Sequence, residues 1–169
     1  MSYKSQDVAN YIVEYHNSIG KPISNLRLQK LLYFTQGLSY MRNQKKLFES
    51  NFEAWRLGPV DVDVYSQFAH NGSSPISTEQ LPKKTQRFDD FSFENGVFIF
   101  NYDDIKELDS DAKKIVEDTV NQLISKTTSA LVEATHNQKP WLEVKEENNI
   151  HKPISDEAIG EFFMESIKE

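Results

Sequence analysis

Residues 24–41 read Ser-Asn-Leu-Arg-Leu-Gln-Lys-Leu-Leu-Tyr-Phe-Thr-Gln-Gly-Leu-Ser-Tyr-Met, and this stretch decides the fold. With helical spacing, one stripe of the predicted helix is formed by Leu28, Leu31, Leu32, Thr35 and Leu38. Aromatic and apolar residues fill much of the remaining circumference, which places such a helix in the middle of a fold. Gly37 inside the helix costs about 1 kcal/mol against alanine, so we expect another backbone to cross close to it.

The segments on either side of this helix predict a mostly helical chain. Amphipathic spacing and N-cap residues indicate further helices after Ser5, Asp61, Asp109, Thr128, Pro140 and Ser155. Leu47 to Leu57 is short, aromatic and irregular, and it is interpreted as an extended segment that turns at Gly58-Pro59. The expected architecture is a mainly α, single compact domain over residues 1–169, with about six helices around the buried central helix and a small β-hairpin insertion.

The hairpin is predicted at about residues 86–102. Asn95-Gly96 separates two aromatic runs and suits a type I′ turn, in which both central residues need a positive φ. The aromatic residues of this segment are Phe88, Phe91, Phe93, Phe98, Phe100 and Tyr102. Strand alternation would place one aromatic face on the helices and another toward solvent or a partner; the alternative is a hairpin covered on both faces.

Composition excludes several classes of protein and site. The sequence contains no cysteine, so neither disulfides nor thiolate metal sites are possible, which fits a reducing cytoplasm. The net charge of −7 opposes binding to a phosphate backbone. The N-terminus lacks the pattern of a signal peptide, and no apolar run is long enough to cross a bilayer. We therefore expect a cytoplasmic protein without nucleic-acid or membrane partners.

Residue patterns for catalysis are weak. The six glycines are scattered and do not form a phosphate cradle. Glu133 and His136 have the Glu-x-x-His spacing of helix-bundle di-iron sites, but only one copy occurs, so a structural histidine is the preferred interpretation. A spatial Ser-His-Asp triad stays open as the basis of a weaker alternative, a hydrolytic enzyme. No catalytic, cofactor-binding or metal-ligating residue is assigned, and the chain is not expected to be an enzyme.

Several motifs together resemble the Panacea antitoxin domain, a family of SocA-like and phage-associated proteins. They are residues 24–37, Phe52-Glu-Ala-Trp-Arg-Leu-Gly-Pro-Val60 and the late His136 with Pro140-Trp141. The resemblance covers Val8 to about Val144, and the hairpin matches least. It implies a binding module of bacterial or prophage origin that neutralises a cognate toxin and can deliver it to a ClpXP-type protease. The alternative is a phage accessory protein that binds a host factor.

The resemblance also points to partner-binding candidates. Together with the hairpin aromatics Phe91, Phe93, Phe98 and Phe100, they are Gln29, Tyr33, Gln36, Trp55, Arg56, His136 and Trp141. Gln29 and Gln36 stand on one face of the central helix, and we expect them to bond the backbone of the crossing segment Trp55 to Pro59. The alternative is a polar groove that binds a partner's backbone. The oligomeric state is not predicted.

Overall fold

The structure, a computed structural model, describes residues 2–145 and 151–168. In chain order the elements are β1 (Tyr3–Lys4), α1 (Ser5–Ser18), α2 (Asn25–Asn43), β2 (Phe48–Glu49), β3 (Phe52–Trp55), β4 (Gly58–Asp61), α3 (Val62–Phe68), β5 (Lys84–Glu94), β6 (Val97–Asp104), α4 (Ser110–Leu123), α5 (Thr128–His136), α6 (Lys139–Leu142), β7 (Lys152–Pro153) and α7 (Asp156–Glu165). Short 3₁₀ turns lie at Ala69–Asn71, Thr78–Gln80 and Ser166–Lys168.

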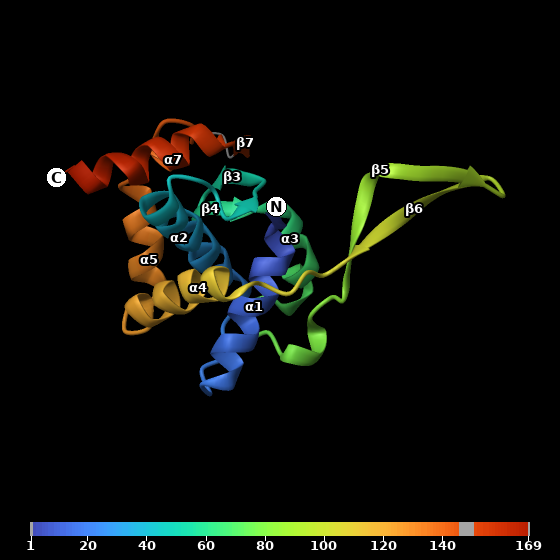
Figure 1. Cartoon of the computed structure of the whole chain (residues 1–169), viewed down its shortest axis with the longest axis horizontal. Coiled ribbons are helices and arrows are strands. Elements are labelled where there is room, and N and C mark those ends of the chain that lie inside the picture. The colour runs from blue at the N-terminus through green and yellow to red at the C-terminus, as the bar shows by residue number, and fades with distance from the viewer. Residues whose placement is uncertain (1, 146–150, 169) are drawn as a thin grey trace.

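Helix α2 lies at the centre of the body, in contact with α1, α3, α4, α5, α7 and β4 (Figure 1). The Ser24 side chain begins it by accepting a hydrogen bond from the Arg27 amide at 3.3 Å. Its core-facing side chains Leu28, Leu31, Leu32 and Tyr33 are fully buried. The helix is apolar around most of its surface because other elements surround it on nearly every side.

The prediction of a mainly α fold is wrong, because the structure is mixed α/β. Helices make up 53% and strands 20%, with seven strands in three sheets among the described residues. β1 pairs in parallel with β2, and β3 lies between β4 and β7 in an antiparallel sheet. These strands are two to four residues long, so the sequence carries little alternation to reveal them. Only β3 and β4 are neighbours in the chain, whereas β1 with β2 and β3 with β7 join distant segments.

Gly37 is explained by a side chain rather than by a crossing backbone. A Cβ built on Gly37 would lie 2.5 Å from Cζ of the Phe163 ring. Phe163 belongs to α7, which packs against α2. Phe163 also packs edge-on against Tyr33, with ring centroids 5.5 Å apart. The glycine therefore makes room for a ring, and the expected backbone crossing at this position is wrong.

Substituting Gly37 with alanine should destabilise the protein by about 1–2 kcal/mol, because overpacking outweighs the gain in helix propensity. Urea denaturation of the G37A variant measures this loss. Shortening the opposing ring with Phe163→Leu should cost less in the G37A background than in the wild type. Equal losses from Phe163→Leu in both backgrounds would contradict the assigned contact.

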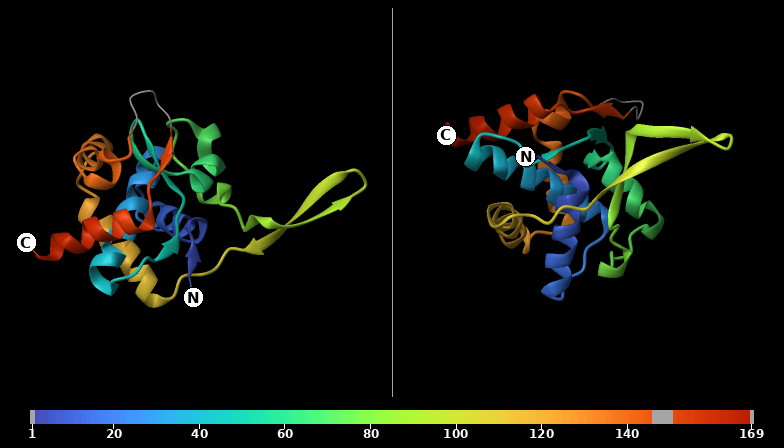
Figure 2. Two further views of the ribbon diagram at one scale, coloured as in Figure 1. Left: turned by 90° about the horizontal axis from the view of Figure 1, so that it is seen from above. Right: turned by 45° about the vertical axis from the view of Figure 1, so that its right-hand side comes forward.

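The hairpin β5–β6 projects from the body as a long arm (Figures 1 and 2). We call residues 84–104 the arm. Its turn residues Asn95 and Gly96 have φ of 52° and 82°, as the type I′ geometry requires. At its base, the Lys4 amine bonds Asp103 at 2.5 Å and the Asp7 carboxylate accepts the Lys106 amide at 2.8 Å. The base of the arm is thus fastened to β1 and the start of α1.

Candidate functional site

Buried polar side chains of α2 hold the β3–β4 hairpin against the helix. The Lys30 amine donates to the Pro59 carbonyl at 2.7 Å, and the Gln29 carbonyl oxygen accepts the Asp61 amide at 2.9 Å. Both α2 side chains are fully buried. Together with Gln36 they form what we call the α2 clamp. Because these groups bond the chain's own backbone, they are satisfied inside the fold.

Gln36 binds a different segment from the one expected. Its side-chain oxygen accepts the amides of Leu47 and Phe48 at 2.9 and 3.2 Å, and its amide group donates to the Phe48 carbonyl at 2.8 Å. Gln36 therefore fixes β2, whereas Gln29 bonds Asp61, just beyond Pro59. The expectation that both glutamines bond residues 55–59 is wrong. Lys30, which the sequence analysis did not single out, makes the hydrogen bond to that bend.

Replacing Gln36 with leucine should destabilise the protein by about 3 kcal/mol, because two buried amides and a carbonyl would lose their partner. Thermal and urea denaturation report the change. The matched control is Gln122→Leu on the exposed face of α4, which should stay within about 0.5 kcal/mol of the wild type. If the two leucine variants lose the same stability, the role given to Gln36 does not hold.

Two buried ionisable groups lie next to this hairpin. Burial lowers the pKa of the Lys30 amine to about 7. Burial also raises the pKa of the Asp61 carboxyl, although Asp61 accepts hydrogen bonds from Ser5 and from the amides of Asn51 and Val64. Both shifts have a structural origin, since each group is surrounded by protein on all sides.

The other face of the β3–β4 turn is covered by aromatic side chains. The Trp141 indole donates to the Trp55 carbonyl at 2.7 Å, and His136 Nε2 donates to the Arg56 carbonyl at 2.9 Å. The His136 ring stacks on Trp141 with centroids 4.2 Å apart. His136 thus has a structural role, which is the interpretation that the sequence favoured. The Arg56 side chain is exposed at the tip of the turn.

Most of the resemblance-derived candidates are therefore brought together, but inside the fold. Tyr33 is fully buried, and its hydroxyl donates to the Gln138 side chain at 2.8 Å. Burial raises the pKa of that phenol. Gln29, Tyr33, Gln36 and Trp141 are not available to a partner without disruption of the core, and Arg56 and half-buried Trp55 and His136 remain at the surface.

The hairpin candidates lie far from this group, on one face of the arm. Cross-strand pairing sets Phe91 opposite Phe100 and Phe93 opposite Phe98. An irregularity between Arg87 and Phe91 brings Phe88 onto the same face, 5.6 Å from the Phe100 ring. We call Phe88, Phe91, Phe93, Phe98 and Phe100 the aromatic face. The helices do not cover it, so both expectations, one aromatic face packed on the helices and a hairpin covered on both faces, are wrong.

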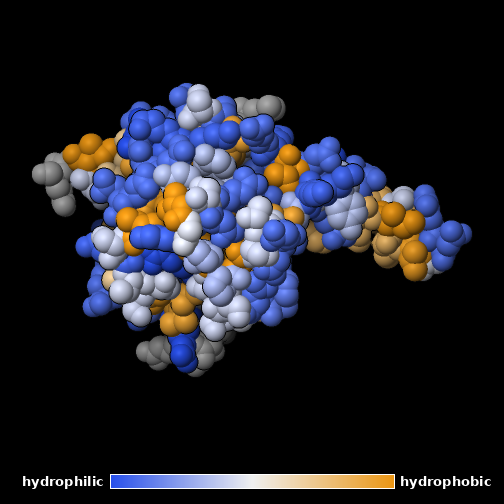
Figure 3. All heavy atoms as spheres, turned by 90° about the horizontal axis from the view of Figure 1, so that it is seen from below, coloured by the Kyte–Doolittle hydropathy of each residue, from blue (hydrophilic) through white to orange (hydrophobic). Residues whose placement is uncertain are grey.

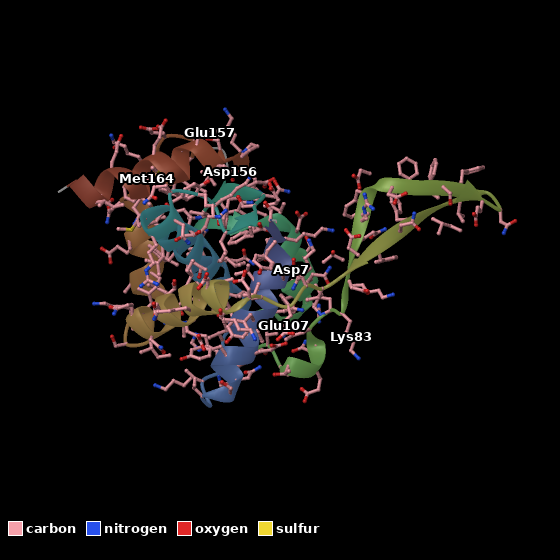
Figure 4. All side chains as sticks on the ribbon, viewed as in Figure 1. Asp7, Lys83, Glu107, Asp156, Glu157 and Met164 are labelled. Atoms are coloured by element: carbon pink, nitrogen blue, oxygen red, sulfur yellow. The ribbon has the colours of Figure 1, made fainter. Side chains whose placement is uncertain are left out.

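A second apolar surface, which the sequence did not indicate, lies along α7. A groove of about 770 Å³ is lined by Tyr40, Gly160, Met164 and Ile167, with Asp156 and Glu157 among the carboxylates at its edge (Figure 4). It forms where the C-terminal half of α2 meets α7. Only the tertiary packing of these two distant segments creates it, so no local pattern could have found it.

The described residues, 2–145 and 151–168, contain no group of three or more histidine, aspartate or glutamate side chains that could hold a metal ion. Within the same residues, no helix combines the length and apolar character needed to cross a bilayer. The surface features that remain to be explained are the aromatic face, the turn at Arg56 and the α7 groove.

Comparison with known proteins gives the family. The model for the antitoxin SocA-like, Panacea domain family matches residues 28–142, which include the α2 clamp, the arm and the aromatic cover of the β3–β4 turn. Antitoxin SocA of Caulobacter vibrioides (strain NA1000 / CB15N) is 39% identical over 82 residues, 48% of this chain and 44% of that relative. The match thus spans less than half of the relative's length. No solved structure matches. The chain belongs to the antitoxin SocA-like, Panacea domain family.

Proposed function

We propose that this chain is an antitoxin that neutralises a cognate toxin protein in the cytoplasm by binding it directly, without catalysis. Membership of an antitoxin family supports this role. The polar residues of the family-like motifs also support it, since Gln29, Lys30 and Gln36 are engaged by the chain's own backbone. Groups used in this way build a scaffold and leave recognition to the surface.

The observation that carries the proposal is where the exposed apolar side chains lie. Of the eleven large apolar side chains exposed in the described part of the chain, seven belong to the arm: Phe88, Phe91, Phe93, Val97, Phe98, Ile99 and Tyr102. In Figure 3 apolar colour lies on the outer part of the projecting arm, between hydrophilic colour at its base and at its tip. Concentrated exposed apolar surface is characteristic of protein–protein contact sites.

Neutralisation can proceed by masking the toxin or by delivering it to a ClpXP-type protease. Both modes begin with the same complex, and they differ in the fate of the toxin. Masking leaves the amount of bound toxin unchanged, whereas delivery shortens its lifetime. A host factor as the partner, the alternative for a phage-associated protein, would leave the toxin active.

The test is co-expression with the protein encoded beside this chain's gene. The proposal predicts that the neighbouring protein stops growth when expressed alone, that this chain restores growth, and that the two proteins elute together in size-exclusion chromatography. A pulse-chase of the toxin in cells with and without ClpXP then separates masking from delivery. Unrelieved growth arrest and separate elution of the two proteins would overturn the proposal.

A further inference from the structure

The aromatic face is a continuous surface made by one element. Ring centroids lie 5.3 Å apart for Phe91 and Phe100 and 5.2 Å apart for Phe93 and Phe98. The diagonal pair Phe91 and Phe98, at 5.6 Å, links the two rows. Side chains extend from both faces of the outer part of the arm (Figure 4), and no other element lies opposite that part in the ribbon views (Figure 2). The rings thus cover one another only at their edges.

The exposed area is large enough for a docking surface. Phe88, Phe91, Phe93 and Phe98 are 69%, 52%, 65% and 62% exposed. With about 200 Å² for one phenylalanine side chain, these four rings present roughly 500 Å² of apolar surface. A stable protein–protein interface takes about 800 Å² from each partner. The aromatic face can therefore supply most of this chain's share.

The charges of the arm indicate what kind of partner fits. Residues 88–101 contain the carboxylates Asp89, Asp90 and Glu94 and no lysine or arginine. The nearest cation along β5, Arg87, already faces Asp89, Asp90 and Asp103 within 3.8 Å. Strand alternation places Asp90 and Glu94 on the reverse face of this two-stranded arm, where Asp90 accepts a hydrogen bond from Asn101 and Glu94 from Ser92. Carboxylates this close behind the rings repel phosphates, which disfavours nucleic acids and anionic bilayers. The negative charge also disfavours a second copy, because each chain carries a net charge of −7.

We propose that the aromatic face is the toxin-docking surface and that the toxin presents an apolar cleft rimmed by lysine and arginine. This inference rests on the proposed antitoxin function and specifies its surface and its partner's chemistry. The phenylalanine rings enter the cleft, and the carboxylates of the arm, among them Asp90 and Glu94 on its reverse face, lie near the basic residues of the rim. Opposite charges at the rim speed the encounter and exclude partners of the wrong charge.

Three variants test the proposal against the protein encoded beside this chain's gene. The ring variant carries Phe88→Ser, Phe91→Ser, Phe93→Ser and Phe98→Ser. The charge variant carries Asp89→Asn, Asp90→Asn and Glu94→Gln. The groove variant, Met164→Ser with Ile167→Ser, removes a similar kind of apolar surface from the α7 groove and serves as the matched control.

Affinity and growth rescue are measured for each variant, after circular dichroism melts confirm an intact body. The ring variant should bind at least 100-fold more weakly and fail to restore growth, while the groove variant should match the wild type. The charge variant should bind about tenfold more weakly at low salt, and its difference from the wild type should shrink at high salt. These three results together support the proposal.

Other outcomes overturn it in distinguishable ways. If the ring variant binds and rescues like the wild type, the docking surface is wrong, but the proposed function stands. If the wild-type chain forms no complex and gives no rescue, the proposed function falls and this inference falls with it. Ring-dependent dimers in sedimentation, or ring-dependent binding to an oligothymidine or to phosphatidylglycerol vesicles, would assign the face to a different occupant.

Discussion

Substituting Gly58 with alanine is expected to be among the most damaging single changes in the body, with a loss of about 4 kcal/mol. Gly58 has a φ of 107°, where side chains are strained. A Cβ there would also lie 2.5 Å from Thr135 Oγ1 and 2.9 Å from Lys30 Cε. The change therefore adds a steric clash to backbone strain at the point where β4, α2 and α5 meet. Urea denaturation measures the loss.

Gly20 provides the matched control for Gly58. It also has a positive φ, 73°, but nothing lies within 4 Å of a Cβ built on it. Gly20→Ala should therefore cost only the strain of the left-handed backbone, about 1–2 kcal/mol. If Gly58→Ala is no more damaging than Gly20→Ala, the packing of the bend against Lys30 and Thr135 is not as described.

Substituting Lys30 with methionine should change how stability depends on pH. The ordinary pKa of the lysine amine is 10.5, and burial lowers it to about 7 in the folded protein. Between these values the unfolded chain binds more protons than the folded chain, so wild-type stability rises with pH, by about 1.4 kcal/mol per pH unit at most. Methionine removes this titration. It also leaves the Pro59 carbonyl without its donor.

The stability lost in the Lys30→Met variant should therefore be about 2–3 kcal/mol larger near pH 9 than near pH 6.5. Urea denaturation of both proteins across this window measures the difference, in which the titration of other groups largely cancels. Lys126→Met, at an exposed position in the α4–α5 loop, is the control and should give a flat difference. A flat difference for Lys30→Met as well would mean that the amine is not held as described.

The sequence predicts well those parts of the fold that depend only on residues close together in the chain. Ser24, Asp109 and Ser155 accept hydrogen bonds from helix N-terminal amides, as their N-cap positions suggest. Asn95-Gly96 forms the predicted turn because both residues tolerate a positive φ. The extended segment before the Gly58-Pro59 turn was expected, and it forms β3. The pairings of β1 and β7 were missed because they are not local: Tyr3 pairs with Phe48, and Ala54 with Lys152.

The candidate site likewise contains features that the sequence predicts and features that it does not. Spacing on α2 correctly placed Gln29 and Gln36 as polar groups with a structural task, but their partners depend on how β2 and β4 cross the helix. Nothing in the sequence indicated that Lys30 is buried, since a lysine on an apolar helix normally extends its amine to solvent. The exposure of the aromatic face could not be predicted, because alternation says which residues share a face and not whether anything covers it.

The central claim is that a mixed α/β body carries an arm whose aromatic face binds the toxin. Amide hydrogen exchange of this chain, alone and in complex with the product of the adjacent gene, tests it most directly. The account predicts slower exchange in residues 88–101 on binding, with α2 amides unchanged. Unchanged exchange in the arm, with new protection at the Arg56 turn or along the α7 groove, would contradict it.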